Sequence, residues 1–243
     1  MLDKTLVKKN FKRSILTYND NACIQKHTAD KIIELIKNNE FQNILEIGSY
    51  TGILTSKITE LNPKFKRYIA VDIVEESAFY LNKINQKIEF INEDIEHFKT
   101  DIKFDLIVSN ASLQWCSEFG EIFKNLKSCL NNGGVIAVSI FNKGNLPEIK
   151  EAFGVELNYP DEKYILDMKA SGILSSDSVI KKESISLEFK SPTEVLRHLK
   201  NTGVNSLKTY NSIGEIKRGF KILNDRFNNK ITYKPLYIKD ISR

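Results

Sequence analysis

The residues most able to do chemistry lie between Asn43 and Gly52, in the stretch N-I-L-E-I-G-S-Y-T-G. A short apolar run there ends in Glu46, and two glycines, Gly48 and Gly52, follow it. A second apolar run ends in Asp72. Glycine lets the backbone approach a ligand closely, and a carboxylate at a strand end can accept hydrogen bonds from two ribose hydroxyls. The pattern is typical of a nucleotide-type cofactor site in an open α/β sheet.

The loop between the two glycines distinguishes among such cofactors. A dinucleotide places its pyrophosphate on a helix N-terminus, which favours the spacing G-x-G-x-x-G. Here Tyr50 occupies the centre of the loop, and no third glycine follows at the required spacing. A phosphate would be crowded, whereas S-adenosylmethionine carries none. The sequence therefore predicts a site for S-adenosylmethionine.

Each strand end supplies a side chain suited to one part of this methyl donor. We expect Glu46 to sense its ammonium group and Asp72 its ribose, while Asp94 accepts from the adenine amino group with Ile95 against the ring. Asn110 follows the next strand and would line the methionine end. The full predicted cofactor-binding set is Tyr18, Glu46, Gly48, Ser49, Gly52, Asp72, Ile73, Asp94, Ile95 and Asn110.

Alternating elements must hold these residues. Apolar periodicity predicts five strands, 43–47, 67–72, 87–91, 104–109 and 135–140, the last after a turn at 132–134. Helices are expected over 52–61, 75–83, 118–130 and 147–153, and two more, 5–17 and 21–37, precede the first strand. Residues 154–178 are expected to be irregular. After them we expect a strand over 180–189, helices over 191–202 and 214–228, and a final strand over 231–239.

This order predicts an α/β fold with a Rossmann-like, seven-stranded, mostly parallel sheet, in which the last strand pairs antiparallel with the fifth. It is the fold of class I methyltransferases. We expect one domain over 1–243, in which 1–40 form an N-terminal helical lid and 41–153 the S-adenosylmethionine-binding core. Residues 154–243 would carry substrate-binding elements and the last two strands.

Composition limits the remaining possibilities. The 243 residues are 41% hydrophobic and 28% charged, which suits one large globular domain. The three cysteines show no motif spacing, so no metal site is expected. The chain has no apolar run of ~20 residues and its N-terminus is charged, so we expect a cytoplasmic protein without membrane association. Residues 181–243 contain 14 Lys and Arg against 6 Asp and Glu, so an acidic partner or simply a solvated basic surface is expected there.

The segment after the fourth strand bears on the methyl acceptor. Amino methyltransferases of nucleic acids carry Asp/Asn-Pro-Pro-aromatic at this place, to hold a flipped base. Here the chain reads S-N-A-S-L-Q-W over residues 109–115, without the two prolines. This argues against a nucleic-acid substrate.

Four segments resemble the malonyl-acyl-carrier-protein O-methyltransferases of biotin synthesis. They are Y-N-D-N-A-C-I-Q at 18–25, S-L-Q-W at 112–115, S-P-T-E-V-L-R-H-L-K-N-T-G-V-N-S-L at 191–207, and Thr232-Tyr233. One departure is Ser49-Tyr50, where that family usually has Cys-Gly. The resemblance implies methylation of the free carboxylate of a malonyl thioester, an early step of biotin synthesis. The implied partner is an acidic acyl carrier protein that carries the malonyl group, or malonyl coenzyme A.

A carboxylate has a pKa of about 4, so it is already ionised at neutral pH and needs no general base. We therefore expect no catalytic acid or base. Gln114 and Trp115 lie where the acceptor should enter, and Tyr18 is the first candidate for a lid residue. Arg197 is hypothesised to contact the malonyl carboxylate, and Lys200, on the same helical face, to meet the carrier protein.

Three other functions stay open at this stage. The first is another small-molecule or lipid methyltransferase that uses S-adenosylmethionine. The second is an NAD-dependent oxidoreductase, against which the missing third glycine argues. The third is a partner-binding protein that retains the fold without turnover.

Overall fold

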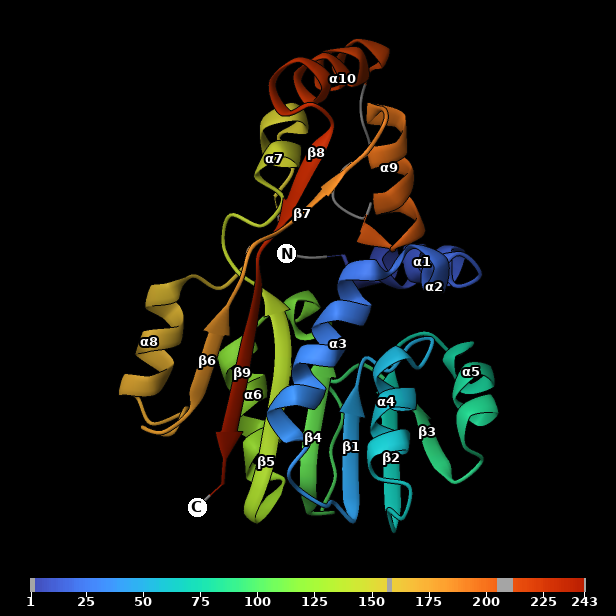
Figure 1. Cartoon of the computed structure of the whole chain (residues 1–243). Helices are drawn as coiled ribbons and strands as arrows, with labels where there is room; N and C mark the ends of the chain where they lie inside the picture. Colours follow the sequence, from blue (N-terminus) through green and yellow to red (C-terminus); the bar gives the residue numbers. More distant parts are fainter. Residues whose placement is uncertain (1–2, 157–158, 205–211, 243) are drawn as a thin grey trace.

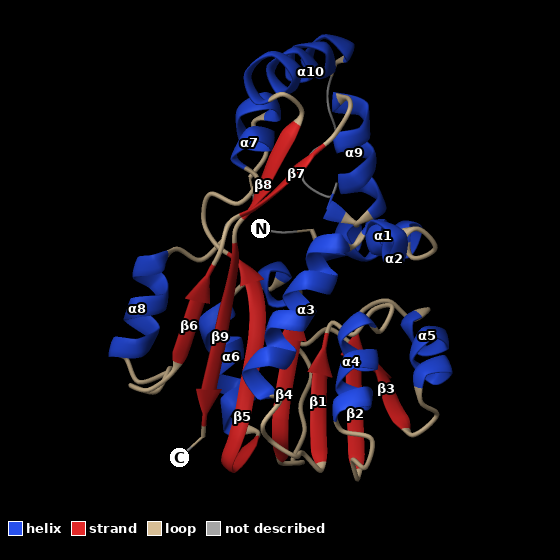
Figure 2. Cartoon of the chain, viewed as in Figure 1, coloured by secondary structure: helices blue, strands red, loops and turns tan. Residues whose placement is uncertain are grey.

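A computed structural model describes residues 3–156, 159–204 and 212–242. Its main feature is a seven-stranded sheet in the order β3-β2-β1-β4-β5-β9-β6 (Figures 1 and 2). The strands are β1 (Asn43–Ile47), β2 (Arg67–Asp72), β3 (Ile88–Asn92), β4 (Phe104–Asn110), β5 (Leu130–Phe141), β6 (Val179–Lys182) and β9 (Pro235–Ile241). Strands β1 to β5 are parallel, and β9 runs antiparallel to both β5 and β6. The predicted fold class and the antiparallel place of the last strand are confirmed.

Helices cover both faces of this sheet, because its central strands are apolar on both sides. On one face, Ile44 and Tyr68 pack in a core with α3 (Cys23–Ile36), α4 (Ile53–Leu61) and α5 (Ser77–Ile84). On the other face, Leu45 and Ile69 pack with α6 (Phe119–Ser128) and α8 (Glu162–Ala170). The carboxyl ends of the parallel strands are left for a ligand.

Two helices, α1 (Lys4–Ser14) and α2 (Tyr18–Asn21), lie above those carboxyl ends (Figure 1). We call α1 and α2 the lid helices. The helix predicted over 5–17 therefore ends early, at Ser14, and a separate short helix begins at Tyr18.

A smaller body stands above the lid helices (Figure 1). It consists of a two-stranded antiparallel sheet, β7 (Ile185–Glu188) with β8 (Lys230–Tyr233), and of α7 (Pro147–Phe153), α9 (Pro192–Asn201) and α10 (Ile213–Phe227). Its own apolar core includes Phe153, Val195, Leu223 and Tyr233. Ser191 caps α9 by accepting a hydrogen bond from the backbone N–H of Glu194, as its sequence indicates.

The two late strands were predicted wrongly as single elements. Each divides between the two sheets, the first after Lys182 and the second at Lys234. Pro235 follows the second division and cannot donate a ladder hydrogen bond there. The alternating pattern persists through both divisions, so it predicts strand but cannot reveal that the chain changes sheets.

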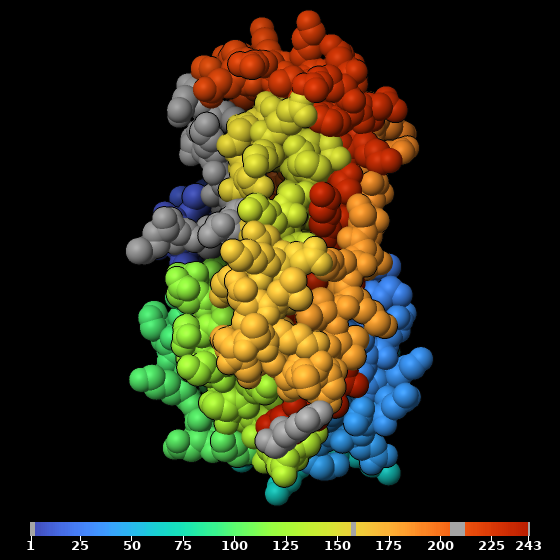
Figure 3. Space-filling model, turned by 90° about the vertical axis from the view of Figure 1, so that its left-hand side faces the viewer, coloured from blue at the N-terminus to red at the C-terminus, as the bar shows by residue number. Residues whose placement is uncertain are grey.

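Two further expectations are corrected. Residues 154–178 are not wholly irregular, because α8 begins at the cap Asp161 and buries Ile165 and Met168. The yellow and orange atoms of this region cover the side of the molecule in Figure 3. The turn at 132–134 lies inside the longer β5, where the register with β4 shifts between Phe104 and Leu106. Across the described ranges, no helix is both long enough and apolar enough to cross a membrane.

Candidate functional site

A pocket opens at the carboxyl ends of the parallel strands, beneath the lid helices. We call it the strand-end pocket; it holds about 700 Å³ of space free of protein atoms, its mouth included. Eight of the predicted site residues line it: Tyr18, Gly48, Asp72, Ile73, Asp94, Ile95, Asn110 and Trp115. The structure therefore brings together side chains that are distant in the sequence.

The two loop glycines are required by their surroundings. Gly48 has φ +71°, and a Cβ there would lie 2.0 Å from Ser112 Oγ. Gly52 has φ +80°, and a Cβ there would lie 2.2 Å from Ile84 Cδ1. Gly48 lines the strand-end pocket, whereas Gly52 is the N-cap of α4 and does not. The glycines thus let the loop lie close to its neighbours.

Asp72 is held rigidly at the end of β2. One carboxylate oxygen accepts a hydrogen bond from the backbone N–H of Tyr50, and the other from that of Val74, each at 2.8 Å. Burial raises the pKa of Asp72 to about 6. The carboxylate keeps acceptor capacity for further donors, as a ribose diol would supply.

Glu46 lies deeper, in a recess that Ser49 also lines. Its carboxylate accepts hydrogen bonds from Thr55 Oγ1 at 2.7 Å and from the Tyr68 hydroxyl. Burial raises the pKa of Glu46 to about 7. Ser49 Oγ is buried and has no hydrogen-bond partner in the described part of the chain. A carboxylate beside an unpartnered hydroxyl suits an ammonium group.

Two of the predicted contacts are already engaged with the protein. The Asp94 carboxylate bonds Lys4 Nζ at 2.6 and 2.8 Å, and Lys4 also pairs with Glu96 at 2.8 Å. The Asn110 side chain donates to Gln25 O at 2.8 Å and accepts from Thr28 and Ser139, so it holds α3 to the end of β4. Nothing in the sequence signals that Lys4 reaches this pocket.

Aromatic side chains hold the lid helices against the loop. The Tyr50 hydroxyl donates to Phe11 O at 2.6 Å, and its ring meets the Tyr18 ring edge-on, with centroids 4.6 Å apart. Phe11 in turn meets Trp115, with centroids 5.7 Å apart. Tyr50 adopts φ +43°, a conformation that favours glycine. Tyr50, one of the two residues that depart from the resembling family, therefore contacts the lid helices.

A second, much tighter pocket, which we call the aromatic pocket, lies beyond Tyr18; about 330 Å³ of space is free of protein atoms there, open solvent at its mouth included. It is lined by Phe11, Tyr18, Gln25, Ala111, Gln114, Trp115, Phe141, Asn145, Tyr159, Thr202, Val204 and Tyr233. Phe11, Tyr18, Ala111 and Trp115 line both pockets and so separate them. The described lining residues carry no charged side chain. The Oε1 atoms of Gln25 and Gln114 are buried without a partner among described residues.

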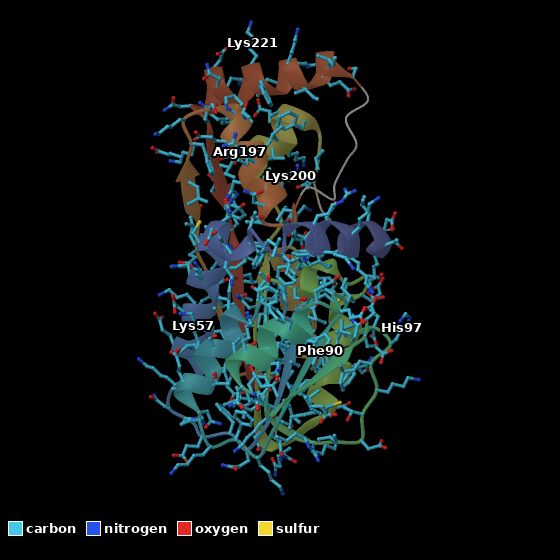
Figure 4. The ribbon with its side chains drawn as sticks, turned by 90° about the vertical axis from the view of Figure 1, so that its right-hand side faces the viewer. Lys57, Phe90, His97, Arg197, Lys200 and Lys221 are labelled. Atoms are coloured by element: carbon cyan, nitrogen blue, oxygen red, sulfur yellow. The ribbon has the colours of Figure 1, made fainter. Side chains whose placement is uncertain are left out.

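Arg197 and Lys200 do not belong to either pocket. Both are exposed on α9, on the face that Figure 4 turns to the viewer. Between them His198 is buried, and its Nε2 lies 3.0 Å from the Tyr233 hydroxyl. Burial lowers the pKa of His198 to about 4, so its imidazole is neutral. The structure thus separates the two cations from Gln114 and Trp115, with which the sequence grouped them.

Several lining residues were missed by the sequence analysis, among them Asn145 and Tyr159. Asn145 follows β5 without a motif, and Tyr159 falls in the stretch read as irregular. Within the described ranges, no group of three His, Cys, Asp or Glu side chains is placed to hold a metal ion.

The chain is similar to a known protein family and to several solved structures. A family described as "Methyltransferase domain" matches residues 22–166. Among solved structures, the YcgJ protein from Bacillus subtilis aligns with a TM-score of 0.65 at 14% identity, covering 89% of this chain and 98% of that one. The N-methyltransferase NodS from Bradyrhizobium japonicum, in complex with S-adenosyl-L-homocysteine, aligns with a TM-score of 0.50 at 15% identity, covering 88% and 85%. These likenesses concern the fold.

Curated relatives are closer in sequence. A malonyl-[acyl-carrier protein] O-methyltransferase from Calditerrivibrio nitroreducens is 34% identical over 83% of this chain and 80% of its own length. Malonyl-[acyl-carrier protein] O-methyltransferase 1 from Ilyobacter polytropus is 32% identical over 95% of this chain and 90% of its own. Taken with the fold and the two adjoining pockets, these relatives show that the chain belongs to the malonyl-[acyl-carrier protein] O-methyltransferase family.

Proposed function

We propose that this protein transfers a methyl group from S-adenosylmethionine to the free carboxylate of a malonyl thioester carried on an acyl carrier protein, giving the methyl ester. The observation that supports this most directly is the pair of adjoining pockets. The strand-end pocket offers carboxylates at the places a nucleoside and an amino acid require, and the aromatic pocket offers neutral walls. Four shared residues separate the two, so a donor and an acceptor could meet there.

The residues of the strand-end pocket and of the recess that Glu46 and Ser49 line fit the methyl donor part by part. Asp72 would accept from the ribose hydroxyls, Glu46 and Ser49 would face the ammonium, and Ile73 and Ile95 would contact the adenine ring. Gly48 leaves no room for a side chain beside Ser112, so backbone lies next to the ligand. When bound, the donor supplies an electrophilic methyl group on a sulfonium.

The chain's own work is then to position the acceptor and to exclude water. An ionised carboxylate is a sufficient nucleophile, so no proton has to be removed. Orientation of two bound reactants can contribute about 7–11 kcal/mol to lowering the barrier. Opposite charges disappear during the transfer, so a site closed by Phe11, Tyr18 and Trp115 and poor in water favours it.

The smaller body supplies a surface for an acidic carrier protein. Arg197 and Lys200 on α9 and Lys217, Arg218 and Lys221 on α10 are all exposed. Figure 4 labels Arg197 and Lys200 on α9 and Lys221 at the top, on α10, all above the lid helices. Within residues 1–40 we assign the lid to α1 and α2 alone, because α3 packs on the sheet; we assign 41–153 to donor binding and 154–243 to acceptor and carrier recognition. The whole would act in the cytoplasm.

The test is a transfer assay with purified protein. S-adenosylmethionine is mixed with malonyl-acyl carrier protein, and the product is analysed by mass spectrometry for a mass gain of one methylene on the malonyl group. Acetyl-acyl carrier protein, which has no free carboxylate, is the control. Binding of the donor without a methyl ester on any malonyl thioester would refute the proposal.

A further inference from the structure

The aromatic pocket presents a problem for the proposed substrate. A carboxylate that leaves water for this pocket needs hydrogen-bond donors, because an unpaired buried charge is costly. The described lining residues include no cation, and Arg197 is exposed on α9. Recognition must therefore come from neutral donors, and the pocket contains three buried phenols, Tyr18, Tyr159 and Tyr233.

The hydrogen bonds around Tyr159 define the direction of its hydroxyl. Asn145 Oδ1 accepts from the backbone N–H of Lys234 at 2.9 Å, which fixes the orientation of the amide. Asn145 Nδ2 therefore donates to the Tyr159 oxygen, at 3.1 Å. A phenol oxygen that accepts keeps its own hydrogen for another partner. No acceptor for that hydrogen lies within bonding distance among described residues.

Tyr233 differs in this respect. Its oxygen pairs with His198 Nε2 at 3.0 Å, and the neutral imidazole can either donate or accept. In one of the two tautomers of His198, the Tyr233 hydroxyl therefore donates its hydrogen to Nε2, and that hydrogen is not available to a ligand. Burial also raises the pKa of Tyr159 above its ordinary value, so this phenol stays protonated at neutral pH. Among the described residues no hydrogen bond fixes the direction of the Tyr18 hydroxyl, whereas the bond from Asn145 fixes that of Tyr159. Tyr159 is therefore the phenol whose hydrogen is both free of a protein acceptor and held in a defined direction.

We infer that Tyr159 donates its phenol hydrogen to the non-reacting oxygen of the acceptor carboxylate, and that Asn145 is a positioning residue that directs this hydrogen into the aromatic pocket. The inference rests on the proposed function and specifies how the same site recognises its acceptor. It replaces the hypothesis that Arg197 contacts the carboxylate.

A neutral donor also suits the reaction. The carboxylate loses its negative charge as the methyl group is transferred. A guanidinium would stabilise the charged ground state more than the transition state, and so would raise the barrier. A phenol also orients the carboxylate, but it raises the barrier less, because it carries no charge and stabilises the charged ground state less strongly.

Two variants test the inference. Tyr159→Phe removes the donor. Asn145→Asp is nearly isosteric and keeps an oxygen for the Lys234 N–H, but its carboxylate accepts the phenol hydrogen and turns it away from the pocket. We expect each variant to lower kcat/KM for malonyl-acyl carrier protein about 10- to 100-fold, as for loss of a hydrogen bond to a charged group. The Kd for S-adenosylhomocysteine should stay within about twofold, which also shows that the variants are folded.

A double variant separates a positioning role from a merely structural one. The double variant uses a neutral substitution, because a carboxylate at position 145 without the phenol would repel the acceptor carboxylate. Asn145→Ala alone should lower kcat/KM, but if Asn145 acts through Tyr159, adding Asn145→Ala to Tyr159→Phe should lower it no further. Tyr164→Phe is the matched control, because Tyr164 also accepts a backbone hydrogen bond, from Gly120 at 2.9 Å, but lines neither pocket. It should leave kcat/KM unchanged.

Three outcomes would overturn the inference. They are a Tyr159→Phe variant with kcat/KM within twofold of the wild type, additive effects in the double variant, and equal losses in Tyr164→Phe. In each of these the wild type still forms the methyl ester, so the proposed function stands. A wild type that forms no ester on any malonyl thioester overturns the inference and the proposed function together.

Discussion

At the scale of single residues, Glu46 is a group whose charge depends strongly on burial. Its pKa is raised to about 7, so it is largely protonated at pH 6 and ionised at pH 8. If it pairs with the donor's ammonium, only the ionised form binds well. The Kd for S-adenosylhomocysteine should then fall about tenfold between pH 6 and pH 8, with titration calorimetry as the measurement. Glu46→Gln should flatten this dependence.

The same carboxyl affects stability with the opposite sign. Its folded pKa lies above its ordinary value of 4.5, so folding favours the protonated form. The stability that it contributes is complete below about pH 4.5 and is lost as the pH rises through about 7. The unliganded wild type should therefore lose Tm relative to Glu46→Gln over this range. Parallel Tm curves would contradict the raised pKa.

Tyr50 is the second residue whose effect can be measured by itself, here its effect on how firmly the lid helices are held. Tyr50→Phe keeps the ring against Tyr18 but leaves the Phe11 carbonyl without its donor. We expect S-adenosylhomocysteine to dissociate about fivefold faster, measured by stopped-flow fluorescence, because one net hydrogen bond is worth about 1 kcal/mol.

Tyr50→Gly provides the contrast. It relieves the backbone at φ +43°, yet it removes every contact with the lid. It should release the ligand faster still, even if its Tm rises. Equal dissociation rates in all three proteins would show that Tyr50 does not hold the lid.

At the scale of elements, α1 is held at both ends. Tyr50 bonds its C-terminal half through Phe11, and Lys4 pairs its first turn with Asp94 and Glu96. The Lys4 pairs are partly buried, and therefore less screened than a surface pair. Lys4→Met should increase amide hydrogen exchange in α1 about fivefold.

Lys12→Met is the matched control on the same helix. Lys12 pairs with Glu76 on the exposed surface, where an ion pair contributes little. Exchange in α1 should stay near the wild-type rate. If the two variants change exchange equally, the Lys4 pairs have no special part in holding the lid.

The sequence predicted an element well where local apolar patterns determine it, and poorly where contacts with distant residues stabilise it. Strands β1, β2 and β4 were placed closely, because they are continuous apolar runs buried on both faces. Helix α8 was missed, since its two buried residues give a weak period and packing on the sheet stabilises it. The glycines and strand-end acids could be read locally. The Lys4–Asp94 pair joins residues 90 positions apart, and no local pattern encodes it.

At the scale of the whole molecule, basic side chains are concentrated in the last quarter of the sequence. Residues 181–243 carry 14 basic against 6 acidic side chains, although the chain as a whole has a net charge of +5. If α9 meets an acidic carrier protein, Arg197→Ala combined with Lys200→Ala should raise KM for malonyl-acyl carrier protein about tenfold, with kcat nearly unchanged. The same variant should turn over malonyl-pantetheine, which lacks the protein, at the wild-type rate.

The matched control for this prediction removes the same number of positive charges from a different part of the surface. Lys64→Ala with Lys66→Ala alters two exposed residues between α4 and β2, at the amino ends of the strands. Because long-range attraction alone follows net charge, whereas docking depends on where the charges lie, only the α9 variant should lose affinity for the carrier. Added salt should narrow the difference between wild type and the α9 variant. Equal KM values in the two double variants would show that net charge, rather than the surface on α9, attracts the carrier protein.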